Sequence, residues 1–462
     1  MIDSLWIIDV LARETMVFAA VGLLVGGLDD LLIDLAFIGH VLWRGRTPRL
    51  MPADLPFPAK PRRIAIFVPA WDEQAVIGAM LSTAIDRFDH PDYRIYVGLY
   101  PNDRATIHAA SAVAELDARI RLVIGPHDGP TTKADCLNTL WRALQRHDTW
   151  DGVETGSIVL HDAEDVVHPG ELRVFAALSP HHDVVQLPVL PLIKRGSRLV
   201  SGHYADEFAE SHAKSLVVRT ALGAGMPLAG TGCAITQTML RRVAVARGGD
   251  PFDATSLTED YELGLRIAEL GGRGLFARVD DGHGGIVAVR AYFPATLDAA
   301  MRQKSRWMTG IALAGWDRTG WARPMALTDH WWRARDRRAP LAIVVLAVAY
   351  LALASWVLAI ALHWQLGGTR ADDGDPAGWL LIVNTALLAW RLGMRMLFTG
   401  RSYGIGEAFW SLPRFVVGNI VALTAAPRAL VRYIGMLRGA PPRWDKTRHE
   451  FPDLSTEPIA AE

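Results

Sequence analysis

The sequence predicts an α/β domain with a doubly wound, mostly parallel sheet, flanked on both sides by helices that cross a membrane. Two observations predict this fold class. Four short apolar runs, each ending in polar residues, alternate with helical patterns, as expected for parallel strands joined by helices. Apolar runs long enough to cross a hydrocarbon core of about 30 Å lie before and after this region.

The composition agrees with a membrane protein that has a large water-exposed part. Charged residues make up 21 % of the chain, below the roughly 25 % of an average soluble domain, and the mean hydropathy is +0.16. Basic and acidic residues balance, 48 against 49, so the charge gives no support for a nucleic-acid partner. The two cysteines, Cys136 and Cys233, exclude a disulfide scaffold and a cysteine-rich metal site.

Three apolar runs are expected to span the membrane. The first lies too far from the start of the sequence and lacks a small-residue cleavage site, so it reads as an uncleaved anchor. The three runs are Met16–Ile38, Pro340–Leu362 and Gly378–Phe398. A fourth stretch, Phe415–Ala426, has only 12 residues and is bracketed by arginines, so we expect it to lie at the membrane surface.

The basic residues predict the orientation. A basic stretch at 333–338 precedes the second span, whereas the connection at 369–375 between the second and third spans is acidic. By the positive-inside bias the central domain faces the cytosol. We therefore expect a membrane helix in 1–43, a cytosolic domain in 44–338, two membrane helices plus an interfacial helix in 339–437, and a cytosolic tail in 438–462.

Three acidic residues, Asp29, Asp30 and Asp34, fall inside the first apolar run. In one interpretation the run tilts or breaks there and leaves the acids at the interface. In the other, the acids face a protein-lined path through the membrane, because intramembrane carboxylates are costly and usually functional. The sequence leaves both interpretations open.

The four predicted strands end in polar residues that can meet a ligand. The first apolar run ends at Ala70-Trp-Asp-Glu73, and the others are Arg94–Leu99, Arg119–Ile124 and Ser157–Leu160. Helices are expected at Ala75–Arg87, from Ala105 and from Lys133. In an open parallel sheet, ligands bind outside the carboxyl ends of the strands.

One polar cluster is too acidic to be explained as a helix cap. His161-Asp-Ala-Glu-Asp165 places three carboxylates within four residues at the end of an apolar strand. Any single acid there could cap a helix or a turn, but three like charges repel unless a cation or extensive hydrogen bonding offsets them. A hard divalent ion that bridges a diphosphate would do so.

Two later motifs fall on predicted helices. Thr258-Glu-Asp260 starts a helix, where Thr258 could equally be a simple N-cap. Gln303-Lys-Ser-Arg-Trp307 places an amide, a guanidinium and an indole at i, i+3 and i+4, on one face that could bind phosphate or stack on a ring. An amphipathic turn near the membrane is the alternative. The isolated histidines 203, 212 and 283 show no metal spacing and are expected to pack or to sit in turns.

Taken together, these motifs resemble the membrane-bound, processive branch of glycosyltransferase family 2, to which cellulose and hyaluronan synthases belong. The five motifs are, in order, Val68-Pro-Ala-Trp-Asp-Glu73, Asn102-Asp103, Asp162-Ala-Glu164, Thr258-Glu-Asp260 and Gln303-Lys-Ser-Arg-Trp307. The chain resembles more closely, and over essentially its whole length, the inner-membrane bacteriophage adsorption protein B family. The features shared with that family are Gly27-Leu-Asp-Asp-Leu31, Tyr100-Pro-Asn-Asp103, His161-Asp-Ala-Glu-Asp165 and the tail Trp444-Asp-Lys-Thr-Arg-His449.

This resemblance implies a GT-A fold and a role for each motif. Asp260 would be the general base, with Glu259 beside it. The residues implied in binding the nucleotide sugar are Asp72, Glu73, Asp103, Lys133 and Asp162, with Asp103 on the uridine. Gly232, Cys233, Gln303, Arg306 and Trp307 would contact the acceptor sugar or the leaving diphosphate. The metal, Mg²⁺ or Mn²⁺, would be held by Asp162 with Glu164 or Asp165, because Asp-Ala-Glu stands where many members have Asp-x-Asp.

The resemblance predicts an inverting transferase that adds a sugar, by likeness to the closer family an N-acetylhexosamine, from a UDP-sugar to a growing exopolysaccharide. The expected partners are the UDP-sugar, a glycan or lipid-linked acceptor, membrane lipids and an outer-membrane export or receptor protein. One alternative is the transfer of a single sugar to a lipid carrier. The other is a scaffold or phage-reception component with a vestigial site, against which the intact motif residues argue.

Overall fold

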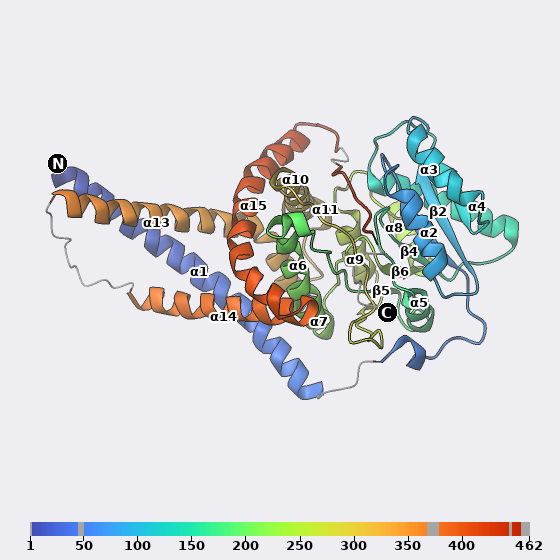
Figure 1. The fold of residues 1–462 in the computed structure, drawn as a ribbon, viewed down its shortest axis with the longest axis horizontal. Helices are drawn as coiled ribbons and strands as arrows, with labels where there is room; N and C mark the ends of the chain where they lie inside the picture. Colours follow the sequence, from blue (N-terminus) through green and yellow to red (C-terminus); the bar gives the residue numbers. More distant parts are fainter. Residues whose placement is uncertain (1, 45–49, 367–377, 443–445, 454–462) are drawn as a thin grey trace.

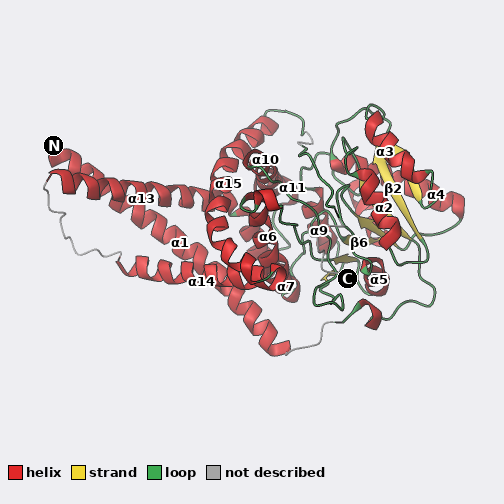
Figure 2. Cartoon of the chain, in the orientation of Figure 1, coloured by secondary structure: helices red, strands yellow, loops and turns green. Residues whose placement is uncertain are grey.

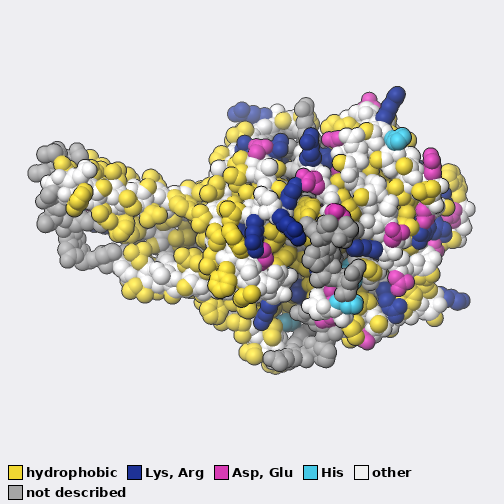
Figure 3. All heavy atoms as spheres, viewed as in Figure 1, with side chains coloured by type: hydrophobic (Ala, Val, Ile, Leu, Met, Phe, Trp, Pro, Cys, Tyr) yellow, Lys and Arg dark blue, Asp and Glu magenta, His cyan; other side chains and the backbone are white. Residues whose placement is uncertain are grey.

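A computed structural model describes residues 2–44, 50–366, 378–442 and 446–453. Figure 1 shows three long helices, α1, α13 and α14, that extend away from an α/β domain at the opposite end of the molecule. Figure 2 shows the strands gathered inside that domain. On the face drawn in Figure 3, the extended helices present mainly hydrophobic side chains, whereas charged side chains gather over the rest of the chain.

The domain is built on a seven-stranded sheet with the order β3-β2-β1-β4-β6-β5-β7. Neighbouring strands are parallel except where β6 pairs with β4 and β5. The strands are β1 Ile64–Pro69, β2 Tyr93–Leu99, β3 Ile120–Ile124, β4 Ser157–Leu160, β5 Val184–Gln186, β6 Cys233–Thr236 and β7 Gly274–Phe276. The four predicted strands are confirmed, and their bounds agree with the prediction to within two residues. The last three, each of three or four residues, were not predicted.

Helices cover both faces of the sheet because successive side chains of a buried strand point to opposite sides. In β1, Ile66 packs into one core with α2 and α5, and Phe67 packs into the other core with α4 and α8. Both side chains are fully buried, and burial of such a side chain contributes about 1.5–3 kcal/mol. The helices of the domain are α2 Ile77–Arg87, α3 Arg104–Ala114, α4 Lys133–Asp151, α5 Glu171–Leu178, α8 Gln237–Arg247 and α9 Glu259–Glu269.

A second group of helices lies between the sheet and the membrane helices. It comprises α6 Val200–Glu210, α7 Leu216–Ala221, α10 Leu297–Met308, α11 Ala314–Thr319 and α12 Leu327–Arg337. Two π-helical turns, Ser211–Ser215 and Thr309–Leu313, join α6 to α7 and α10 to α11, and single 3-10 turns occur at Pro52–Asp54 and Arg195–Ser197. Gly310 in the second π turn is required for close packing, because a Cβ there would lie 2.5 Å from the Thr258 hydroxyl.

Four helices are long and apolar enough to cross a membrane: α1 Ile2–Arg44, α13 Ala339–Leu366, α14 Gly378–Tyr403 and α15 Ile405–Leu437. The first three contain the three predicted spans. The predicted interfacial stretch is part of a much longer helix of 33 residues, which contains Pro413 and Pro427. In Figure 1, α15 runs across the junction between the extended helices and the domain rather than along them. The acidic connection at 369–375 lies outside the described residues.

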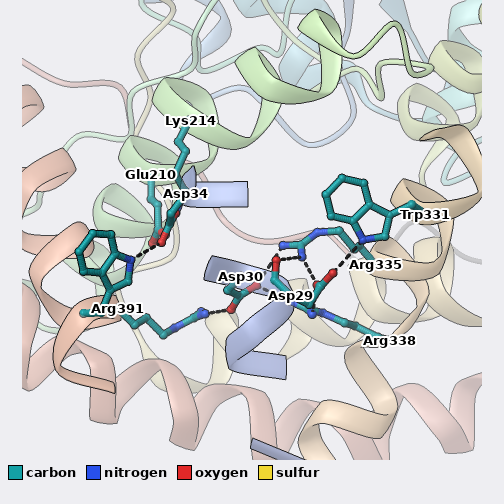
Figure 4. A network of polar contacts seen from close by, with 10 residues as sticks. Asp29, Asp30, Asp34, Glu210, Lys214, Trp331, Arg335, Arg338 and Arg391 are labelled. Carbon is teal, nitrogen blue, oxygen red and sulfur yellow. Dashed lines mark hydrogen bonds and ion pairs between the residues drawn. The ribbon is translucent and has the colours of Figure 1, made fainter. Parts of the chain in front are cut away.

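The acids of the first apolar run bind α1 to its neighbours (Figure 4). The helix does not break at them. Asp29 accepts a hydrogen bond of 2.8 Å from the Trp331 indole and pairs with Arg335 and Arg338. Asp30 pairs with the same two arginines, at 3.0 and 2.5 Å, and also with Arg391 of α14.

Asp34, one turn further along α1, makes an independent contact. It lies 2.5 Å from Lys214 Nζ and accepts a 2.8 Å hydrogen bond from the Trp390 indole. Because these partners belong to the π turn after α6 and to α14, the three acids together fix α1 against the domain and against α14. They therefore mark the level at which the membrane helices meet the domain.

Removing one of these acids should loosen this junction. We expect Asp30→Ala to lower the free energy of unfolding by about 1–3 kcal/mol, because three guanidinium groups lose a shared partner. This is less than for a fully buried pair, since the Asp30 side chain is 21 % exposed. Thermal unfolding in lipid nanodiscs measures the change. Glu14→Gln, whose carboxylate on the same helix pairs with an exposed arginine, is the control. Equal stability of the two variants would contradict the anchoring role.

Candidate active site

The predicted motifs converge on one cavity of about 460 Å³ at the carboxyl edge of the sheet. β1, β2 and β4 run parallel and side by side, so their carboxyl ends meet at this edge. The predicted residues that line it come from five different segments. These residues are Glu73, Lys133, Asp162, Glu164, Asp165, Glu259, Asp260, Gln303, Arg306 and Trp307.

The loop after β1 is ordered by its neighbour after β2. Asp72 has a positive φ of 54°, and its N–H donates to Asp103 Oδ2 at 2.6 Å. Asp103 also caps α3, because its Oδ1 accepts from the Thr106 N–H at 3.2 Å. Asp72 and Asp103 do not line the cavity, whereas the buried Glu73 does. The role of Asp103 on the uridine stays a prediction, and the contact it makes here is to the backbone.

The acidic cluster after β4 contains its own buried cation. His161 Nδ1 lies 2.9 Å from Asp165 and its Nε2 lies 2.7 Å from Glu171, and all three side chains are buried. Burial disfavours the charged imidazole, but Glu171 and Asp165 outweigh this effect and raise the pKa of His161 to about 10. A permanent imidazolium thus offsets part of the repulsion between the clustered carboxylates.

The three acids of this cluster have different surroundings. Asp165 accepts hydrogen bonds from His161, from the Asp162 N–H at 2.8 Å and from the Thr231 hydroxyl. Asp162 lies 2.5 Å from Lys133 Nζ. Within the described residues, Glu164 pairs with neither His161 nor Lys133. Of the two candidates for the second metal ligand, the geometry therefore favours Glu164 over Asp165.

Lys133 links the metal motif to the general-base motif. Besides Asp162, its Nζ donates to the Gly230 carbonyl at 3.2 Å and lies 3.9 Å from Glu259. Burial disfavours the ammonium, but the surrounding carboxylates outweigh it and raise the pKa of Lys133. Gly230 must be glycine, because its φ is 76° and a Cβ would lie 2.6 Å from Asp260 Oδ2.

Asp260 has the properties of a general base at neutral pH. It lies in the first turn of α9 and accepts a 2.8 Å hydrogen bond from the Tyr261 N–H. Burial and the adjacent Glu259 raise the pKa of Asp260 to about 7, although Lys133 opposes the shift. A base works best when its pKa lies near the working pH. Thr258 occupies the N-cap position, but its hydroxyl makes no cap hydrogen bond.

The opposite wall of the cavity is the face of α10 that carries Gln303, Arg306 and Trp307. Within the described residues, Gln303 Oε1 and Arg306 Nε are buried without a hydrogen-bond partner. Trp307 packs against three aromatic rings, those of Tyr204, Phe208 and Phe293, with centroid distances of 6.0–6.5 Å. Unpaired buried polar atoms beside an aromatic face suit a hydroxyl-rich ligand.

Gly232 and Cys233 do not line the cavity. Gly232 has a φ of 59°, its N–H donates to the Leu160 carbonyl at 2.9 Å, and a Cβ there would lie 2.6 Å from Val289. Cys233 opens β6 and is fully buried. Their neighbour Thr231 lines the cavity instead. These two residues build the strand, and their predicted contact with the acceptor remains untested.

Two functional contacts come from the tail and were missed by sequence reasoning. Lys446 Nζ lies 3.0 Å from Glu73 Oε1 and also donates to the carbonyls of Trp71 and Asp72. His449 Nδ1 lies 2.8 Å from Glu73 and 3.2 Å from Glu164. The only signal in the sequence was a group of basic residues in the shared tail motif, of which Trp444 and Asp445 lie outside the described residues.

The pKa values of Glu164 and His449, which lie in contact, are both shifted. Burial raises the pKa of Glu164 to about 8, the nearby His449 opposes the shift, and Asp162 and Glu73 add to it. Burial disfavours a charged His449, but Glu164 and Glu73 outweigh it and raise the pKa of His449 to about 9. The cavity therefore retains protons where carboxylates crowd together, which is the environment that a divalent cation would neutralise.

Comparison with known proteins identifies the family. Residues 61–310 match the family described as glycosyltransferase like family 2. The chain belongs to this family. It is 33 % identical, over 97 % of its length, to bacteriophage adsorption protein B of Escherichia coli K12 and to bacteriophage N4 adsorption protein B of E. coli O157:H7. It spans 64 % of the length of these relatives.

The fold of this family 2 chain is similar to that of a solved transferase. Mannosyltransferase PcManGT from Pyrobaculum calidifontis, solved in complex with GDP-Man and Mn²⁺, has a TM-score of 0.53 and 19 % identity. The match covers 87 % of this chain and 99 % of that one. The GT-A fold class predicted from the motifs is confirmed.

The buried imidazolium gives this family 2 site a testable pH dependence. The pKa of His161 is raised above the ordinary value of 6.5, so its contribution to stability is complete below about pH 6.5 and is lost as the pH rises towards 10. We expect His161→Gln to lower the free energy of unfolding by about 3–5 kcal/mol near pH 6.5, because Asp165 and Glu171 lose their shared cation.

Unfolding followed from pH 6.5 to 10 measures this prediction. The difference between wild type and His161→Gln should shrink as the pH rises. His147→Gln is the control, because burial lowers the pKa of His147 and removes the reason for an alkaline trend. A His161→Gln deficit that stays constant across this range would show that the imidazole is neutral.

Proposed function

We propose that the chain is an inverting glycosyltransferase that transfers an N-acetylhexosamine from a UDP-sugar to a growing exopolysaccharide at the cytosolic face of the bacterial inner membrane. The observation that carries the proposal is Asp260, a carboxylate whose pKa is raised to about 7, in a cavity shared with the Lys133–Asp162 pair and the α10 face. Family membership supports the reaction class.

Asp260 and Arg306 have different roles in the reaction. A sugar hydroxyl is a weak nucleophile, so Asp260 accepts its proton as the oxygen attacks the anomeric carbon. The bond from that carbon to the diphosphate breaks in the same step, which inverts the configuration. Arg306 faces the cavity with an unpaired N–H and stabilises the charge that develops on the leaving diphosphate.

A divalent cation fits the residues present. At the end of the cavity around Glu164, the carboxylates of Glu73, Asp162 and Asp165 lie close by, and burial together with these acids raises the pKa of Glu164. Asp162 and Glu164 would hold Mg²⁺ or Mn²⁺, which would neutralise the diphosphate. The similar mannosyltransferase was solved with Mn²⁺ and a nucleoside diphosphate sugar, which supports this class of donor and ion. The uridine base is carried over from the motif resemblance alone.

The α10 face supports an acceptor that continues towards the membrane. Lys304, on the same helix, lies 4.9 Å from the Trp307 ring and pairs with Glu207 of α6. Behind it a second cavity of about 370 Å³ is lined by α1, α6, α12, α14 and α15. Its mixture of acidic and basic side chains can bond a hydroxyl-rich glycan, which favours polymer extension. A lipid-linked acceptor uses the same position, and an outer-membrane export or receptor partner would take the product further.

Nucleoside diphosphate release from a panel of UDP-sugars, in nanodiscs with Mn²⁺ or Mg²⁺, tests the proposal. We expect release with one donor, and a loss of about 10²–10⁴-fold in Asp260→Asn, because the base is gone. In wild type, kcat/KM should rise with pH through about 7, since only the deprotonated Asp260 accepts a proton. Glu115→Gln, an exposed acid at the end of α3, should behave as wild type.

Two outcomes decide between the alternatives. Long products that carry the inverted linkage support an exopolysaccharide, and single-sugar products on lipid support the carrier reaction. Absence of both donor binding and release, in a protein that is folded, would contradict the transferase proposal and favour a scaffold.

A further inference from the structure

The segment that follows the last long helix closes the acidic end of the active-site cavity. Lys446 binds two backbone carbonyls of the loop after β1, Glu450 pairs with Lys194, and Phe451 packs against the hydrophobic core. Thr447 is buried in the same segment. The tail is therefore seated by contacts on both sides of His449, which holds the imidazole at the carboxylates.

Glu164 lacks a counter-charge of its own unless His449 is present. Asp162 has Lys133 at 2.5 Å, and Asp165 has His161 at 2.9 Å. In the described parts of the chain, the ion-pair contact of Glu164 is with His449. Of the three acids in the motif, Glu164 is thus the one that the tail imidazole touches.

The geometry of this group suits a metal ion. One ligand atom from each of Glu73, Glu164 and His449 lies within 4.8 Å of the other two. His449 Nδ1 is 2.8 Å from Glu73 and 3.2 Å from Glu164. With metal–ligand bonds of about 2.1 Å, adjacent ligands of an octahedral ion lie about 3 Å apart. These separations therefore match those of neighbouring ligands around one ion.

The far side of the imidazole is also arranged as in a metal site. His449 Nε2 lies 3.1 Å from the Thr447 hydroxyl. A metal-ligating histidine normally donates its other ring N–H to such an acceptor, which fixes the ring and leaves the facing nitrogen free to bind the ion. The Thr447 hydroxyl can accept a hydrogen bond from the Nε2–H, which leaves Nδ1 free to bind the ion.

We propose that His449 is a ligand of the divalent cation, together with Glu73 and Glu164, so that the tail completes the metal site. This inference rests on the proposed function for the reaction that the ion serves. An imidazole ligand also favours Mn²⁺ over Mg²⁺, because Mg²⁺ prefers oxygen ligands. The site should therefore prefer Mn²⁺, and His449 should be the source of that preference.

The test uses the full chain in nanodiscs with Mn²⁺ alone and no donor. We expect electron spin-echo modulation from an imidazole ¹⁴N coupled to the bound Mn²⁺ in wild type, and its loss in both His449→Ala and His449→Gln. Mn²⁺ affinity should fall by at least about tenfold in both variants, since even an outer partner of a metal ligand is worth 10–100-fold. The preference for Mn²⁺ over Mg²⁺ should shrink with it.

Glu450→Gln is the matched control, because it removes a neighbouring tail contact but none of the three ligands. It should keep the ¹⁴N signal. Wild-type unfolding temperatures in the His449 variants exclude misfolding as the cause of any loss. A wild type without ¹⁴N modulation would overturn the proposal. So would tighter Mn²⁺ binding in His449→Ala, which would mean that the imidazole competes with the ion.

These readouts are independent of turnover. If the ¹⁴N signal is present but no donor releases a nucleoside diphosphate, the metal assignment stands and the proposed function fails. If release depends on metal but the ¹⁴N signal is absent, the proposed function stands and this inference fails.

Discussion

The active-site cavity brings partly buried carboxylates close to one another, and the contacts of several surrounding elements compensate their charge. Seven acids line it: Glu73, Asp162, Glu164, Asp165, Glu259, Asp260 and Glu450. In a partly buried site each like-charged neighbour costs free energy unless a cation lies close by. The chain supplies cations from separate segments: His161 from within the acidic motif, Lys133 from the start of α4, and two more from the tail. Burial raises the pKa of Asp260 and of Glu164 in spite of the nearby Lys133 and His449, and there the chemistry is expected.

At the junction with the membrane helices, too, partly or fully buried acidic side chains are paired with basic ones. Asp29 and Asp30 meet three arginines, and the fully buried Asp206 of α6 lies 3.1 Å from Arg414 of α15. These contacts hold α1 and α15 against their neighbours, because loss of one partner would leave a poorly compensated charge. The π turn after α10 also donates the Thr309 hydroxyl to the Ala429 carbonyl of α15 at 3.3 Å. The helix that carries Trp307 is thus positioned by α15.

The parts of this fold that were predictable are those coded locally. β1 to β4 are apolar runs bounded by turn residues, and the acidic motif follows β4 directly. β5 to β7 are three or four residues long and gain their strand character from pairing, so no local pattern identifies them. The helix α15 is 33 residues long because tertiary contacts support its arginines, whereas the apolar stretch alone suggests 12.

The candidate site was predictable in its motifs but not in its contacts. The tail histidine lies 376 residues from Glu73 and almost 300 from Glu164, distances over which a sequence pattern carries no geometry. The sequence suggests a catalytic domain and a separate tail, but in the fold the tail packs as part of the α/β domain. Phe451 belongs to the core of the α/β domain, and Lys446 binds the loop after β1. Because the segment joining them to α15 is short, the acidic end of the cavity is connected to the last long helix on one side and to the sheet on the other.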